Sequence, residues 1–121
     1  MKSDGGEVDV MKYRILGCAV AIAVASSMAE AESMRALAAQ KIGEAMALAA
    51  KCSSLELDAA KITAAVESSG VPVKGLMDQA GMVSEKVIIR LQGSDESVAC
   101  ELGRTLYGPE GSKAQGFLKL K

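Results

Sequence analysis

Apolar residues recur at three- and four-residue intervals along most of the chain after residue 31, which is the spacing of amphipathic α-helices. No long stretch alternates apolar and polar positions as a half-buried strand would. The pattern therefore predicts four helices, over about 32–51, from Ser53 to about 69, from the link at 71–73 to about 92, and from about 95 to 107.

Residues that start or stop helices mark the predicted ends. Ser53 and Glu56 match a capping box, in which Ser53 caps the second helix and Glu56 bonds back to it. Gly70 is a natural left-handed terminator of that helix. The Tyr107-Gly108-Pro109 turn stops the fourth helix, and we expect Tyr107 to anchor the segment that follows.

Four helices with short connections predict an all-α fold, a small four-helix bundle-like domain over 32–109. The segment 110–121 contains two glycines and predicts an irregular C-terminal tail. We expect Phe117, Leu118 and Leu120 in this tail to pack on the core, because an exposed tail would not need them.

Small residues recur one helical turn apart at Ala39, Gly43 and Ala47, and again at Ala99 and Gly103. Such residues allow two helices to approach closely. An alanine-rich composition produces the same spacing, and we favour it as the cause, with close packing as the alternative.

The segment 11–31, ahead of the first helix, has the composition of a signal peptide. Lys12 and Arg14 form its basic end, and 15–25 form an unbroken apolar stretch. Residues 1–10 are partly acidic where a signal is basic, so we expect translation to begin at Met11 and 1–10 to be a misassigned start.

Ala29 and Ala31 form an A-x-A site, which predicts cleavage of the signal before Glu32. The alternative is a retained membrane anchor, but a spanning helix needs about 20 apolar residues and Glu30 interrupts this stretch too early. We therefore predict a periplasmic or secreted protein with no stable membrane anchor after cleavage.

Cys18 ends the sequence Ile15-Leu16-Gly17-Cys18, which resembles the lipobox of bacterial lipoproteins. Only these three apolar residues separate Arg14 from Cys18, and a lipoprotein signal needs a longer apolar stretch there. We read Cys18 as an apolar residue of the signal, with a lipid anchor as the alternative.

Cleavage before Glu32 removes 31 of the 121 residues and leaves 90, the size of one small domain. This part carries 11 acidic and 11 basic side chains, so its formal charge is zero. Nucleic acids and anionic membrane surfaces select clustered positive charge, and the balance argues against both. An unidentified protein partner remains open.

Two cysteines, Cys52 and Cys100, remain once Cys18 leaves with the signal. An even number of cysteines in an exported protein predicts a disulfide. Closing a loop of this length stabilises the fold by roughly 4 kcal/mol in the chain-entropy model. The alternative is a pair of buried free thiols.

The sequence lacks the residue sets of common catalytic sites. No histidine is present, the serines have no Gly-x-Ser-x-Gly context, and the glycines do not form a phosphate loop. Two cysteines without histidine fall short of the four ligands of a structural zinc site. We predict no catalytic, cofactor-binding or metal site, and no enzymatic activity.

The methionines Met34, Met46, Met77 and Met82 could line an adaptable apolar groove for peptides or lipids. Methionines at helical spacing are more often ordinary core residues, and we favour that interpretation.

We therefore expect a non-enzymatic exported protein with a binding or structural role in the cell envelope. Small periplasmic acid-stress chaperones are similar in size, in export and in the Cys52…Cys100 separation. This resemblance implies an alternative function, in which acid protonates the carboxylates and charge repulsion exposes apolar side chains to clients. A secreted inhibitor or immunity-type protein is a further alternative.

Overall fold

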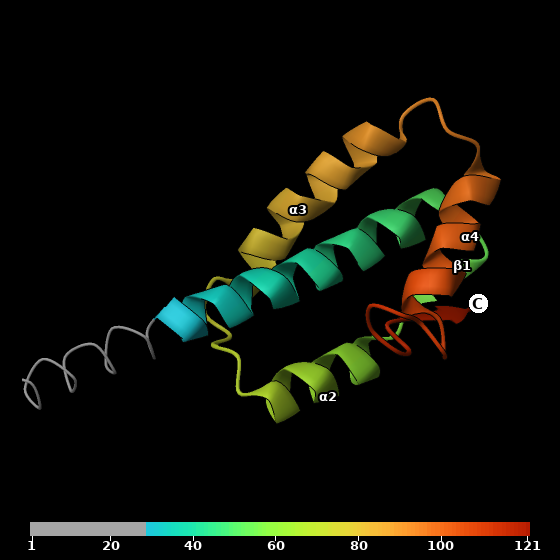
Figure 1. Ribbon diagram of the computed structural model, residues 1–121. Helices are drawn as coiled ribbons and strands as arrows, with labels where there is room; N and C mark the ends of the chain where they lie inside the picture. Colours follow the sequence, from blue (N-terminus) through green and yellow to red (C-terminus); the bar gives the residue numbers. More distant parts are fainter. Residues whose placement is uncertain (1–28) are drawn as a thin grey trace, which may run out of the picture. The chain divides into compact units, whose positions relative to one another are not determined.

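The computed structural model describes residues 29–121, in which four helices and two short strands follow one another (Figure 1). The first helix covers 29–51. The other elements are β1 (Leu55–Leu57), α2 (Ala59–Ser69), α3 (Leu76–Leu91), α4 (Glu96–Tyr107) and β2 (Leu118–Leu120). The contacts divide the chain after Ser33, and Met34–Lys121 form one compact unit. The start predicted at Met11 and the signal residues up to 28 lie outside the described residues.

The C-terminal ends of the helices within residues 29–121 were predicted to within one residue. The first helix ends at residue 51, and α2 ends at Ser69, where Gly70 takes a left-handed φ of 71°. The third and fourth helices end at Leu91 and Tyr107, within one residue of the predicted positions. None of the helices within 29–121 has the length and apolar character needed to cross a membrane.

The first helix and α3 lie side by side and approach closely at Gly43 (Figure 1). A Cβ added at Gly43 would lie 2.7 Å from the Cβ of Val83 and would also overlap the carbonyl oxygen of Ala80. Gly103 on α4 is less restricted, because its Cβ would meet only the terminal methyl of Leu55, at 2.6 Å, and that of Leu118, at 3.1 Å. The favoured interpretation of the small residues as mere composition is therefore wrong at Gly43, where two helices approach closely.

The all-α prediction needs a correction, because β1 and β2 pair as an antiparallel ribbon in which Leu55 faces Leu120. The capping box predicted at Ser53 and Glu56 does not form. Glu56 lies in β1 opposite Lys119, a favourable pair of opposite charges across the strands. Helix α2 instead begins after Asp58, whose side chain accepts a hydrogen bond from the Lys61 amide at 3.1 Å.

The C-terminal tail is irregular only up to its last few residues. Phe117 and Leu118 are buried as predicted, whereas Leu120 is 68% exposed and was placed wrongly in the core. The tail becomes a strand because the backbone of β1 needs hydrogen-bond partners, which β2 supplies. The Asp58 amide extends the pairing by donating to the Phe117 carbonyl at 2.9 Å.

Candidate functional site

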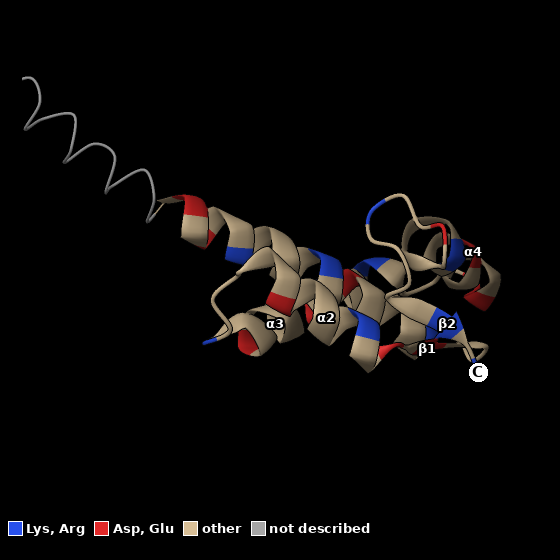
Figure 2. Ribbon diagram, turned by 90° about the horizontal axis from the view of Figure 1, so that it is seen from below, with Lys and Arg blue, Asp and Glu red and all other residues tan. Residues whose placement is uncertain are grey.

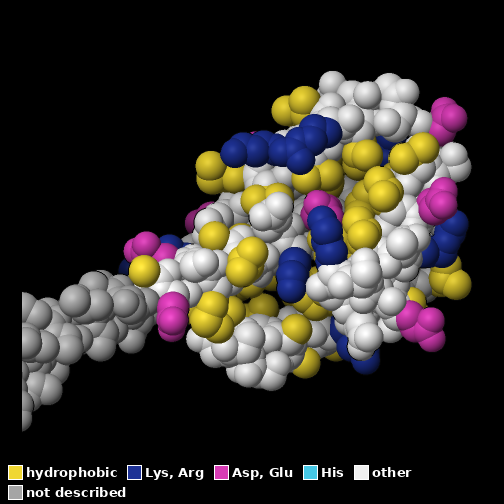
Figure 3. Space-filling model, in the orientation of Figure 1, with side chains coloured by type: hydrophobic (Ala, Val, Ile, Leu, Met, Phe, Trp, Pro, Cys, Tyr) yellow, Lys and Arg dark blue, Asp and Glu magenta, His cyan; other side chains and the backbone are white. Residues whose placement is uncertain are grey.

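A cavity of about 380 Å³ lies between the first helix, α2 and the segment before β2. In Figure 3, hydrophobic side chains and Lys or Arg side chains gather between the first helix and α2 on the face shown. The lining is mainly apolar and consists of Met34, Leu37, Ala38, Lys41, Ile42, Ala65, Val66, Ser69, Val71, Lys113, Ala114, Gln115 and Phe117. Its volume falls in the range of small-molecule sites, about 300–1,000 Å³.

The cavity lies where α2 packs only partly on the core. Helices α3 and α4 each bury several residues, whereas none of the 11 residues of α2 is fully buried. The inward residues Ala65 and Val66 are only half-buried, since they face the cavity. Ala65 is a small side chain, so a larger residue at this position would take up part of the space.

The floor of the cavity is part of the hydrophobic core. Ile42, Val71 and Phe117 line the cavity and are at most 7% exposed. The Phe117 ring stacks on Tyr107, with ring centroids 6.2 Å apart and an interplanar angle of 21°. A ligand in this cavity would therefore contact side chains that the fold holds in place.

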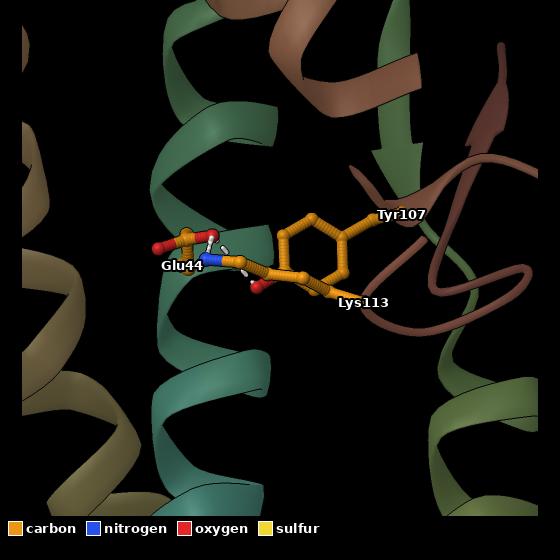
Figure 4. A network of polar contacts seen from close by, with 3 residues as sticks. All are labelled: Glu44, Tyr107 and Lys113. Carbon is orange, nitrogen blue, oxygen red and sulfur yellow. Dashed lines mark hydrogen bonds and ion pairs between the residues drawn. The ribbon is translucent and has the colours of Figure 1, made fainter. Parts of the chain in front are cut away.

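Tyr107, Lys113 and Glu44 form a polar network beside the cavity (Figure 4). The Tyr107 hydroxyl and the Lys113 ammonium both donate to Oε1 of Glu44, each at 2.8 Å. Tyr107 is fully buried, and burial together with the neighbouring Glu44 raises its pKa well above the usual value. The tyrosine therefore remains a neutral hydrogen-bond donor at physiological pH, and it anchors the tail as predicted.

Lys41 and Lys113 are the two charged residues that line the cavity. Glu44 pairs with Lys113, but within residues 29–121 no carboxylate lies at ion-pair distance from Lys41. Elsewhere acidic and basic residues are interspersed along the helices (Figure 2). The mouth of the cavity thus carries two ammonium groups against one neighbouring carboxylate.

The predicted cysteine pair lies at the other end of the first helix. The sulfurs of Cys52 and Cys100 are 1.97 Å apart, a disulfide distance, and the link spans 48 positions of sequence. The hydroxyl of Ser54 lies 3.2 Å from the Cys52 sulfur. Nearby, the hydroxyl and the backbone amide of Ser53 both donate hydrogen bonds to the Glu96 carboxylate, the amide at 2.7 Å. These hydrogen bonds lower the pKa of Glu96.

The ligand atoms of Cys52, Glu96 and Cys100 lie within 4.8 Å of one another. Metal binding by cysteine requires the thiolate. With the two sulfurs bonded to each other no thiolate is left, so this group offers a metal only the exposed carboxylate.

The predicted cleavage residues Ala29, Ala31 and Glu32 lie in the described part of the first helix and do not line the cavity. The cavity itself was missed from sequence. Of the four methionines considered for a groove, Met34 lines the cavity, while Met77 and Met82 are exposed on α3. Lys41 interrupting the apolar stripe of the first helix was the one sequence signal that could have located the mouth.

A scan of protein-family models and searches of curated proteins and of solved structures found no match for this chain. The functional proposal below therefore depends on the geometry and chemistry of the cavity.

Proposed function

We propose that this chain is an exported, non-enzymatic binding protein that holds a small apolar ligand in the cavity. The observation that carries the proposal is the open space of about 380 Å³ above a buried apolar floor. A concave, mainly apolar site of this volume with a few polar groups is typical of small-molecule binding. Helix α2 contacts the core through Ile62, Ala65 and Val66 but leaves this space open along its length.

An alkyl or aryl ligand fits the chemistry of the lining. Ile42, Val66, Val71 and Phe117 offer apolar contact area from the first helix, from α2 and from the segments that follow α2 and precede β2. Each methylene moved from water into such a site contributes about 0.8 kcal/mol. This corresponds to an affinity gain of about fourfold for each added methylene until the cavity is full.

Export is supported by the signal-like segment at 11–31 and by the disulfide distance between Cys52 and Cys100. The compact unit begins at Met34, so removal of the residues before Glu32 would leave this unit complete. A binding protein of the cell envelope would then be released with its cavity intact.

Binding rather than catalysis is supported by the groups around the cavity. The Glu44 carboxylate already accepts hydrogen bonds from Tyr107 and Lys113, and the raised pKa of Tyr107 keeps its hydroxyl neutral. The chain also has no histidine to act as a general base. These residues can position a ligand, but they do not form a nucleophile and base pair.

The test uses the full chain, expressed with its leader and purified from the cell envelope. Titration with the neutral dye N-phenyl-1-naphthylamine should give saturable fluorescence at one site per chain. Ala65→Phe fills the cavity from α2 and should weaken dye binding at least tenfold. The matched control is Ala64→Phe, since Ala64 is exposed and does not line the cavity. Absence of saturable binding, or equal binding by both variants, would overturn the proposal.

A further inference from the structure

We propose that the cavity selects a single-chain amphiphile with a monoanionic head group, of which an alkyl carboxylate is the simplest case. This inference rests on the proposed function, because the head group matters only if the cavity accepts the chain. It concerns the charged mouth of the cavity, where Lys41 and Lys113 approach from different parts of the chain.

The charge at the mouth favours a monoanion. Lys113 is neutralised by Glu44, whose Oε1 lies 2.8 Å from the lysine nitrogen. Lys41 has no carboxylate at ion-pair distance within residues 29–121. One positive charge is therefore left uncompensated at the edge of an apolar space, and a ligand with one negative charge balances it.

Glu44 is held by Tyr107 and Lys113. Its Oε1 accepts a hydrogen bond from the Tyr107 hydroxyl at 2.8 Å and another from the Lys113 ammonium. Tyr107 is fully buried and stacked on Phe117, which fixes the position of its hydroxyl. The network thus ties the Glu44 carboxylate to Lys113 and Tyr107 (Figure 4). Within residues 29–121, Lys41 has no such ion-pair partner and can meet a ligand.

The position of Lys41 on its helix joins the charged and apolar parts of the site. Leu37 and Ala38 precede it by four and three residues on the same helical face, and both line the cavity. Lys41 lines the cavity beside this apolar wall and is itself exposed to solvent. An ordinary lysine that extends into water has the same placement, so the decisive observation is dependence on the head group.

The expected preference is intermediate between an exposed ion pair and a buried charged hydrogen bond. Exposed ion pairs strengthen binding by at most about fivefold, and charge-assisted hydrogen bonds by about tenfold or more. A half-open mouth should therefore favour the carboxylate over the matching alcohol by about tenfold, equivalent to about 1.4 kcal/mol.

The test measures displacement of the neutral dye from the full chain by decanoate, decanol, decyltrimethylammonium and decyl phosphate, all below their micelle concentrations. Decanoate should bind about tenfold more tightly than decanol, and the cation most weakly. Tighter binding of decyl phosphate than of decanoate would overturn the monoanion assignment. Equal binding of decanoate and decanol would overturn the inference but leave the proposed function, whereas no displacement by any of the four would overturn both.

Variants separate the head-group contact from general effects. Lys41→Gln should weaken decanoate about tenfold and leave decanol unchanged, whereas Lys86→Gln on α3, outside the cavity lining, should change neither. Glu44→Gln removes the carboxylate that pairs with Lys113 and should strengthen decanoate binding. Retained discrimination in Lys41→Gln would contradict the assignment of Lys41 as the head-group contact.

Discussion

The Cys52–Cys100 link can be removed cleanly by the double substitution Cys52→Ala and Cys100→Ala. The link spans 48 positions and encloses β1, α2 and α3. In the chain-entropy model, a loop of this length restricts the unfolded chain by about 4 kcal/mol at 25 °C. Removal of the link should therefore lower the free energy of unfolding mainly by increasing the conformational entropy of the unfolded chain.

A smaller loss comes from the folded state. Cys52 is fully buried, so alanine leaves a small void where the sulfur was, at a cost of about 1 kcal/mol. The total loss of about 5 kcal/mol is a large part of the stability of a small domain. For a domain of 60–100 residues, each kcal/mol lowers Tm by about 4–8 °C, so the variant should melt at least about 20 °C lower.

The assay is urea unfolding followed by circular dichroism, on the full chain purified from the cell envelope. Wild-type protein is compared with its chemically reduced form and with the double variant. The double variant should be about 1 kcal/mol less stable than the reduced form because of the void at Cys52, and the m-values of both forms should rise because the unfolded chain expands. A difference in unfolding free energy below about 1 kcal/mol would refute the loop-entropy account, and two alkylatable thiols in the purified protein would refute the disulfide.

Three further predictions concern two side-chain hydrogen bonds and the helix packing at Gly43. Tyr107→Phe should cost about 1.5 kcal/mol. The pKa of Tyr107 is raised in the folded state, so the stability that its hydroxyl contributes is fully present below the ordinary pKa of 10.0 and is lost as pH rises above it. Wild-type protein should therefore lose stability above this pH more steeply than the variant. Urea titrations at several pH values would show the difference. The lowered pKa of Glu96 predicts the reverse. The bonds from Ser53 should stabilise the fold above the ordinary value of 4.5 and should be lost as pH falls through the lower folded value, a dependence that Glu96→Gln should remove from the same titrations. Gly43→Ala should lower stability by about 1–3 kcal/mol, whereas Gly81→Ala, which meets no atom within 4 Å, should raise it by about 0.5–1 kcal/mol, as thermal melting would show.

The parts of the fold that depend on neighbouring residues were predictable from sequence. Gly70 and the turn after Tyr107 end their helices through local backbone geometry, which a pattern of residues reveals. The ribbon was not predictable in this way. Leu55-Glu56-Leu57 is too short to show an alternating pattern, and its partner Leu118–Leu120 lies at the far end of the chain.

The capping box failed because a distant group competed for Ser53. Glu96, 43 residues further on, accepts hydrogen bonds from the hydroxyl and the amide of Ser53. Asp58 caps α2 instead. The cavity likewise depends on contacts between segments that are distant in the sequence. Its opening depends on where α2 lies relative to the core, which the periodicity of α2 does not specify.

The central claim is that an apolar chain binds between the first helix and α2, and nuclear Overhauser effects from bound ligand to protein methyl groups test it most directly. With isotope-labelled full-length protein and unlabelled decanol, we predict contacts to Ile42, Val66 and Val71, which line the cavity. Contacts restricted to Met82 and Ile89, which are exposed on α3 and do not line the cavity, would contradict the account.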